Sequence, residues 1–272
     1  MAIHRASSLN SFQEQQIQDL VNLCTDFDQT NTSFPFEDAS QFLFAERDSR
    51  IIAASAFVPV DEKLYECSAF THPDFRKRGF FSRLLEDGLA MLPEDSELIF
   101  YADPDHGCAA SVLLSIGAEQ DSEEHMMKLL PETFADYFSD AEHAEETLPA
   151  QEISLSFSEI DDTATLCFSA PHAVIYFSIF PSHSYLYGFE VDETCRGIGY
   201  GTKFLNTVLS LLLSGQFFSG HDASCSLDGV SALKNAVNHP VLLQVAGDNL
   251  PALSLYKKTG FQITETLQCY FY

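Results

Sequence analysis

The chain has 272 residues, 46% of them apolar, and a formal net charge of −26, so its length accommodates two domains of ordinary size. No apolar run approaches the roughly 20 residues of a membrane-spanning helix, and the N-terminus lacks the apolar centre of a signal peptide. We therefore expect a cytoplasmic protein without a membrane partner, and the acidity argues against nucleic acid as a partner because its phosphates would be repelled.

The cysteines and histidines give no sign of a metal site. Seven cysteines are scattered without a C-x-x-C pair, and nine histidines show no H-x-x-x-H spacing. This pattern predicts reduced, mostly buried thiols and indicates neither a zinc site nor a disulfide framework. We expect no metal. The acidic surface would suit a cationic, amine-bearing substrate, although solubility is the simpler explanation of the charge.

The first half alternates helical and strand patterns, which is typical of the α/β class. Ser11 is the expected N-cap of the first helix, and the polar residues 47–50 are expected to connect two apolar strands as a hairpin. The expected elements are a helix over 9–28, strands over 42–45, 51–58 and 64–70, a helix ending near 91, a strand over 98–102, a short helix over 109–115 and a strand over 124–130.

Residues 131–150 are acidic and contain two prolines, which is typical of a connection between domains. We therefore expect one domain at 1–132, an acidic linker at 133–150 and a second domain at 151–272. Strands are expected in the second domain over 153–157, 165–168, 173–180, 185–191 and 241–245.

The most informative stretch is the loop after the strand over 185–191. It carries glycines at positions 197, 199 and 201 and opens an apolar helix. Glycines let backbone N–H groups approach a ligand closely, and the start of a helix carries partial positive charge, so the loop forms a socket for phosphate oxygens. A plain tight turn is the alternative interpretation. The spacing disfavours the dinucleotide fingerprint G-x-G-x-x-G.

Two blocks together resemble a known family. Arg196-x-x-Gly199-x-Gly201 is similar to the Q/R-x-x-G-x-G/A signature of the GNAT superfamily of N-acetyltransferases. The strand over 241–245 is followed by residues 249–261, which look like the family's N-x-x-A-x-x-L-Y-x-x-x-G-F block at the expected distance and in the expected order. The resemblance covers residues from about 170 to 272.

The halves repeat one another, which extends the resemblance to the whole chain. Arg76 and Gly79 lie 120 residues before Arg196 and Gly199, whereas Gly117 lies 143 residues before Gly260. The difference predicts an insertion around residues 216–239 of the second half. The resemblance implies two tandem GNAT-like acyl-CoA N-acyltransferase folds, each with a central mixed, mostly antiparallel sheet flanked by helices, an α/β fold of mixed α+β character.

The repeat also suggests which half is catalytic. The position of Gly201 is taken by Phe81 in the first half, where a benzyl group would crowd a pyrophosphate. The positions of Asn249 and Tyr256 are taken by His106 and Leu113, and leucine cannot donate a proton. We therefore predict a degenerate first domain, with two active sites as the alternative.

The resemblance implies acetyl-CoA as co-substrate and assigns roles to named residues. Tyr256 would protonate or stabilise the leaving thiolate, and Asn249 would cap its helix or bond the cofactor arm. Glu190 is the candidate base because it is a carboxylate on the strand beside the expected acetyl position, with Asp192 and Glu193 as alternatives. The residues expected to bind the cofactor are Val191, Arg196, Gly197, Ile198, Gly199, Tyr200, Gly201 and Asn249.

The predicted function is transfer of an acetyl group from acetyl-CoA to a primary amine, on a small molecule or a protein, by direct attack of the amine. The alternative is a non-catalytic acyl-CoA-binding sensor or scaffold. The acceptor and the oligomeric state are left open, because acceptor sites of this family are built from its most variable segments.

Overall fold

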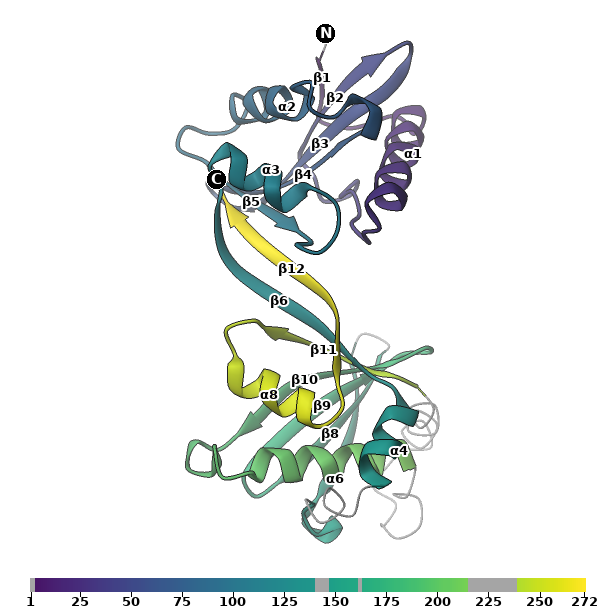
Figure 1. The fold of residues 1–272 in the computed structure, drawn as a ribbon, viewed down its shortest axis with the longest axis vertical. Coiled ribbons are helices and arrows are strands. Elements are labelled where there is room, and N and C mark those ends of the chain that lie inside the picture. Colours follow the sequence, from purple (N-terminus) through teal and green to yellow (C-terminus); the bar gives the residue numbers. More distant parts are fainter. Residues whose placement is uncertain (1–2, 140–146, 161–162, 215–238) are drawn as a thin grey trace. The chain divides into compact units, whose positions relative to one another are not determined.

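The structure is a computed structural model that describes residues 3–139, 147–160, 163–214 and 239–272 (Figure 1). Residues 216–238 of the predicted insertion lie outside this description. Within the described residues, no helix is both long enough and apolar enough to cross a membrane. The fold is mixed α/β, with mostly antiparallel strand pairing and flanking helices, as the sequence predicted.

The chain divides into two compact units. The first unit comprises residues 1–123 together with 266–272, and the second comprises residues 124–265. The predicted domains 1–132 and 151–272 differ from this division at both ends, because two strands join the unit that the sequence did not assign them to. Residues 124–129 pair within the second unit, and the last residues of the chain complete the sheet of the first.

The first unit is a sheet with helices on both faces. Its strands follow the order β1-β2-β3-β4-β5-β12, and all neighbours are antiparallel except β4 and β5. Helix α1 packs on one face and helices α2 and α3 contribute to the core of the other. Its elements are β1 (Ile3–Ala6), α1 (Ser11–Asp28), β2 (Gln41–Arg47), β3 (Arg50–Asp61), β4 (Leu64–Thr71), a 3-10 turn (Pro73–Phe75), α2 (Phe80–Leu89), β5 (Glu97–Ala102), α3 (Ala109–Ile116) and the end of β12 (Gln262–Phe271).

The second unit repeats this sheet without an equivalent of α1 among its described residues. Its strands follow the order β6-β11-β10-β9-β8-β7, with β10 and β11 parallel. Phe134 of α4, Phe204 of α6 and Leu253 of α8 belong to one core, which places these helices on one face. Its elements are β6 (Glu119–Leu129), α4 (Pro131–Ser139), a 3-10 turn (Ala150–Glu152), β7 (Ser154–Ile160), β8 (Thr163–Ala170), β9 (Ala173–Ile179), β10 (Ser184–Val191), a 3-10 turn (Glu193–Cys195), α6 (Tyr200–Ser214), β11 (Val241–Ala246) and α8 (Leu250–Lys258).

Local chemistry explains the start of the first helix and the first hairpin. Asn10, not the predicted Ser11, caps α1: its side chain accepts hydrogen bonds from two backbone N–H groups, and the side chain of Gln13 accepts one from the Asn10 N–H. Asp48 and Ser49 have φ of 52° and 61°, the left-handed values that a two-residue hairpin requires. The predicted hairpin of β2 and β3 is therefore confirmed.

Candidate active site

The glycine loop forms an open start to helix α6. Gly197 and Gly199 have φ of 73° and 86°, which glycine adopts without strain, and no atom lies within 4 Å of where a Cβ would stand on either. The Lys203 N–H bonds the Gly199 carbonyl at 3.1 Å and begins the helix. Because the first turn of α6 carries no acidic side chain, its free N–H groups and the helix dipole favour an anion there.

Gly201 also has a packing role in the fold. A Cβ at this position would lie 3.2 Å from Leu255 Cδ1 and 3.3 Å from Val191 Cγ2. The glycine therefore lets α6 pack closely against α8 and β10. At the repeated position the Phe81 ring packs edge-on against Phe100, with centroids 6.3 Å apart, within the core of the first unit. Crowding of a pyrophosphate by Phe81 is accordingly a weak argument for degeneracy.

The two repeated arginines share one contact and differ in another. Arg196 Nε donates to the Val191 carbonyl oxygen at 2.8 Å, and Arg76 Nε donates to the Thr71 carbonyl oxygen at 3.1 Å. Asp28 accepts two further hydrogen bonds from Arg76, at 2.7 and 2.6 Å, and these bonds raise the pKa of Arg76. Within the described part of the chain no carboxylate pairs with Arg196, so its remaining N–H groups can serve an anion.

Strands β10 and β11 separate beside the loop. Their pairing ends at Leu186 and Leu243, although β10 continues to Val191 and β11 to Ala246. The register of β10 against β9 also shifts between Tyr187 and Glu190. The two strands thus leave an opening near Val191, and an extended amide-bearing chain can pair with strand backbone exposed in such a gap. In the first unit β4 and β5 separate in the same way after Glu66 and Ile99.

Helix α8 brings Asn249 and Tyr256 to this region. Asn249 caps the helix, because its side-chain oxygen accepts the Ala252 N–H at 3.2 Å. The Tyr256 side chain is buried, with ring centroids 5.6 Å from Phe261 and 6.4 Å from Phe189 of β10. Burial raises the pKa of Tyr256 to about 12. Its hydroxyl bonds no group in the described residues, yet its oxygen is not among their fully buried, unpartnered atoms, so it keeps some access to solvent.

The three candidate bases surround one pocket at the end of β10. Glu190, Asp192 and Glu193 line a cavity of about 410 Å³ together with Arg196. Glu190 is exposed and lies opposite Val174 of β9. His172 Nδ1 lies 2.9 Å from an oxygen of Asp192, and the His172 ring packs against Tyr200 at 5.6 Å between centroids.

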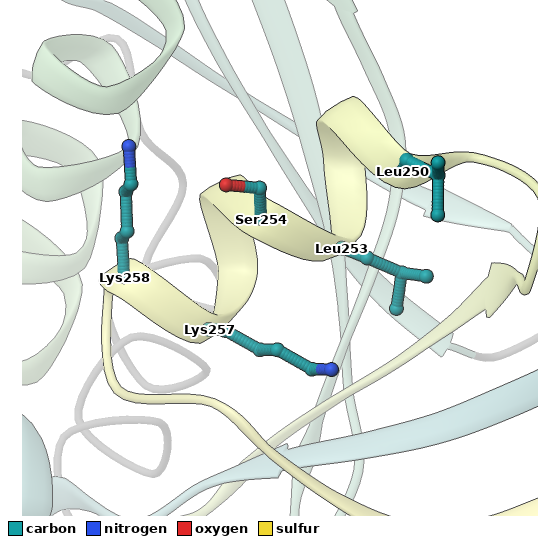
Figure 2. A pocket seen from close by; sticks show the side chains of 5 residues that line it. All are labelled: Leu250, Leu253, Ser254, Lys257 and Lys258. Carbon is teal, nitrogen blue, oxygen red and sulfur yellow. The ribbon is translucent and has the colours of Figure 1, made fainter.

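A second, open pocket lies on helix α8. It has a volume of about 490 Å³ and is lined by Leu250, Leu253, Ser254, Lys257 and Lys258. Figure 2 shows the two lysine side chains pointing away from one another on either side of the helix. On a chain of net charge −26, these lysines mark a locally cationic surface that suits a phosphate. No cluster of potential metal ligands occurs among the residues described.

Sequence reasoning missed one feature of this unit, a stacked pair of tyrosines. Tyr176 of β9 and Tyr187 of β10 lie opposite each other, with centroids 5.5 Å apart and an interplanar angle of 24°. Gly188, with φ of 57°, follows Tyr187 at the register shift. An isolated glycine inside a strand pattern is the signal that could have indicated the bulge.

Comparison with known families finds a match to part of the first unit. Residues 9–108 match the acetyltransferase (GNAT) family. This match lies in the half that the sequence motifs did not single out. A search of curated protein sequences finds no match to this chain.

Solved structures share the fold over the whole chain. A tandem GNAT protein from the clavulanic acid biosynthesis pathway is 13% identical, with a TM-score of 0.62 over 100% of this chain and 98% of that one. A GCN5-related N-acetyltransferase from Sphaerobacter thermophilus is 14% identical, with a TM-score of 0.59 over 99% and 95% of the two chains. A GNAT-family acetyltransferase from Colwellia psychrerythraea is 11% identical, with a TM-score of 0.54 over the full length of both. At these identities the likeness concerns the fold.

Proposed function

We propose that this chain, which contains an acetyltransferase (GNAT) domain at residues 9–108 and has the fold of a tandem GNAT protein, transfers an acetyl group from acetyl-CoA to a primary amine in its second unit. The observation that carries the choice of the second unit is Arg196, which pairs with no carboxylate among the described residues, whereas Asp28 holds its counterpart Arg76. Arg196 lies beside the opening between β10 and β11. The open glycine loop adjoins the end of β10, and Tyr256 packs against Phe189 of the same strand.

The residues around this opening fit the parts of acetyl-CoA. The N–H groups at the start of α6, with Gly197, Gly199 and Arg196, suit a pyrophosphate. The strand backbone near Val191 suits the amide groups of the pantetheine arm. Lys257 and Lys258 offer positive charge to a further phosphate. Bound acetyl-CoA would supply the activated thioester. Asn249 caps its helix with its side-chain oxygen, and its side-chain N–H groups can still donate to the cofactor arm.

Tyr256 would stabilise the leaving thiolate by a hydrogen bond. At a pKa of about 12 the phenol is protonated at neutral pH. Complete transfer to a thiolate with a pKa near 8.5 would cost about 5 kcal/mol, because the phenol is the weaker acid. We therefore assign Tyr256 the role of hydrogen-bond donor and leave the final protonation of the thiolate to solvent.

The acceptor amine must lose its proton before attack. A lysine-like amine with a pKa near 10.4 is neutral about once in 2,500 molecules at pH 7, a cost of about 4.6 kcal/mol. Glu190 is exposed, so its carboxylate can attract the ammonium group of the acceptor and order the water molecule that takes the proton. The new N–C bond then forms as the C–S bond breaks.

The Glu190→Gln variant tests this role. We expect kcat/KM to fall about tenfold at neutral pH, because the carboxylate no longer assists deprotonation. Activity should recover in part as the pH approaches about 10, where the amine loses its proton unaided. The measurement is kcat/KM against pH for variant and wild type, with Glu193→Gln as the control.

Parallel pH profiles for Glu190→Gln and wild type would remove Glu190 from this role and point to Glu193 or bulk water. A non-catalytic acyl-CoA-binding protein would bind acetyl-CoA and release no thiol with any amine. Three expectations from the sequence stay predictions: a cytoplasmic location, no nucleic-acid or membrane partner, and no need for a metal. The sequence makes no prediction about the oligomeric state.

A further inference from the structure

The two faces of the second unit's sheet differ in what covers them. Phe134, Phe204 and Leu253 place α4, α6 and α8 on one face. No other α-helix occurs among the described residues of this unit. In the first unit the opposite face is covered by α1, whose Ile17 and Leu20 pack in one core with Ala54 and Ala56 of β3.

The repeat shows that this opposite face has changed character. Ala54 and Ala56 of β3 are buried under α1, and Phe70 of β4 packs against the same core. The residues 120 positions later are Val174, Tyr176 and Glu190, and none of them is buried. An apolar surface shaped for a helix has thus been replaced by aromatic and acidic groups. Side chains of this kind suit a cationic ligand better than an apolar helix.

The bulge in β10 organises these groups. In the first unit the pairing of β3 with β4 runs without a shift from Ala53 to Pro59, whereas β10 shifts at Gly188. The shift sets Tyr187 opposite Tyr176. Tyr176 Cδ2 lies only 2.9 Å from the position that a Cβ on Gly188 would occupy, so the ring packs directly against the glycine. Tyr187 is 37% exposed.

The electrostatics of Tyr176 agree with this arrangement. The Cys167 thiol and, more weakly, the Glu190 carboxylate raise the pKa of Tyr176. Glu190 also lines the pocket that holds Asp192 and Glu193. The tyrosine pair is therefore continuous with the end of β10, where the amine is expected to react.

We propose that the Tyr176–Tyr187 pair binds a second positive charge on the acceptor, so that the preferred substrates are compounds with two cationic amines. This inference rests on the proposed function. The proposed acetyl-CoA site uses the helix-covered face and the strand opening, which leaves the face that no described helix covers for the acceptor. One amine would lie near Glu190, and the other would rest on the tyrosine pair, about 7 Å away along the strand.

The physical reason for this preference is charge complementarity. A protonated amine over a tyrosine ring is stabilised by the ring's quadrupole, and the chain's net charge of −26 adds a long-range attraction. The reacting amine must become neutral, so only a second amine keeps its positive charge throughout the reaction. Diamines would therefore exceed monoamines of equal length in kcat/KM.

The test compares 1,4-diaminobutane with butylamine. We expect the wild-type ratio of kcat/KM to exceed, by about fivefold or more, the factor of about two that two equivalent amines give by chance. Tyr187→Leu should reduce the ratio about fivefold. Gly188→Ala should reduce it too, because the new methyl group displaces the Tyr176 ring. Tyr101→Leu, an exposed tyrosine of the first unit, should leave the ratio unchanged.

Two outcomes overturn the inference while leaving acetyl transfer intact. One is a wild-type kcat/KM for 1,4-diaminobutane that exceeds that for butylamine by no more than the factor of about two expected by chance. The other is a ratio of these two kcat/KM values that Tyr187→Leu does not alter. Calorimetry measures the affinity of the same two amines for the protein with CoA present. It needs no turnover, so it tests the second cation site even if no amine is acetylated. Equal affinity of wild type for both amines in that experiment would also overturn it.

Discussion

The Gly199→Asp variant should lose acetyl-CoA binding. Gly199 stands at the open start of α6, where no atom lies within 4 Å of the Cβ position. A carboxylate there would face the phosphates, and two like charges about 4 Å apart repel by about 1 to 4 kcal/mol, depending on the local dielectric. With more than one phosphate charge nearby, we expect affinity to fall at least about 100-fold. Calorimetry with acetyl-CoA measures this.

Two control variants separate repulsion from backbone strain. Gly199→Asn adds the same bulk at the same φ of 86° without the charge and should retain much of the affinity. Gly79→Asp places the same carboxylate in the equivalent loop of the first unit, where φ is 77° and the Cβ position is also open. Undiminished binding to Gly199→Asp, or loss of binding to Gly79→Asp alone, would move the cofactor site out of the second unit.

The Tyr256→Phe variant should lower kcat by about 100-fold, within the usual range for loss of a hydrogen-bond donor to the charge that develops in the transition state. Phenylalanine preserves the ring contacts with Phe189 and Phe261 and removes only the hydroxyl. Because burial raises the pKa of Tyr256 to about 12, the phenol stays protonated below about pH 10. The loss should therefore be nearly constant across that range, and acetyl-CoA affinity should change little.

A buried tyrosine of the first unit provides the matched control. Tyr270 is 1% exposed, and its hydroxyl donates to Gln268 at 2.7 Å. Tyr270→Phe removes a buried hydroxyl in the same way and should leave kcat unchanged. An unchanged kcat in Tyr256→Phe would return Tyr256 to a packing role beside Phe189 and Phe261.

Local patterns predicted most elements, because those patterns report local energetics. Two apolar runs at 42–45 and 51–58, joined by a polar turn at Asp48 and Ser49, specify the β2–β3 hairpin within one short stretch. The partners of β6 and β12 are not local. Met127 pairs with Leu243, and Tyr270 with Phe100, so long-range packing decides which unit each strand joins.

The site was predictable where backbone chemistry dictates the residue. Gly197 and Gly199 need positive φ, and an asparagine before an apolar helix signals the cap that Asn249 provides. A sequence does not show which atoms of the fold surround the Cβ position of a glycine. For this reason the sequence did not indicate that Gly201 makes room for Leu255. The bulge at Gly188 and the stacking of Tyr176 on Tyr187 likewise depend on strand register.

The most direct test of the account is an assay of thiol release from acetyl-CoA with a panel of primary amines. The account predicts amine-dependent release by wild type, with acetylated amine formed in equal amount, and a large loss in Tyr256→Phe. Binding of acetyl-CoA without thiol release from any amine would contradict it and would establish the chain as a non-catalytic acyl-CoA-binding protein.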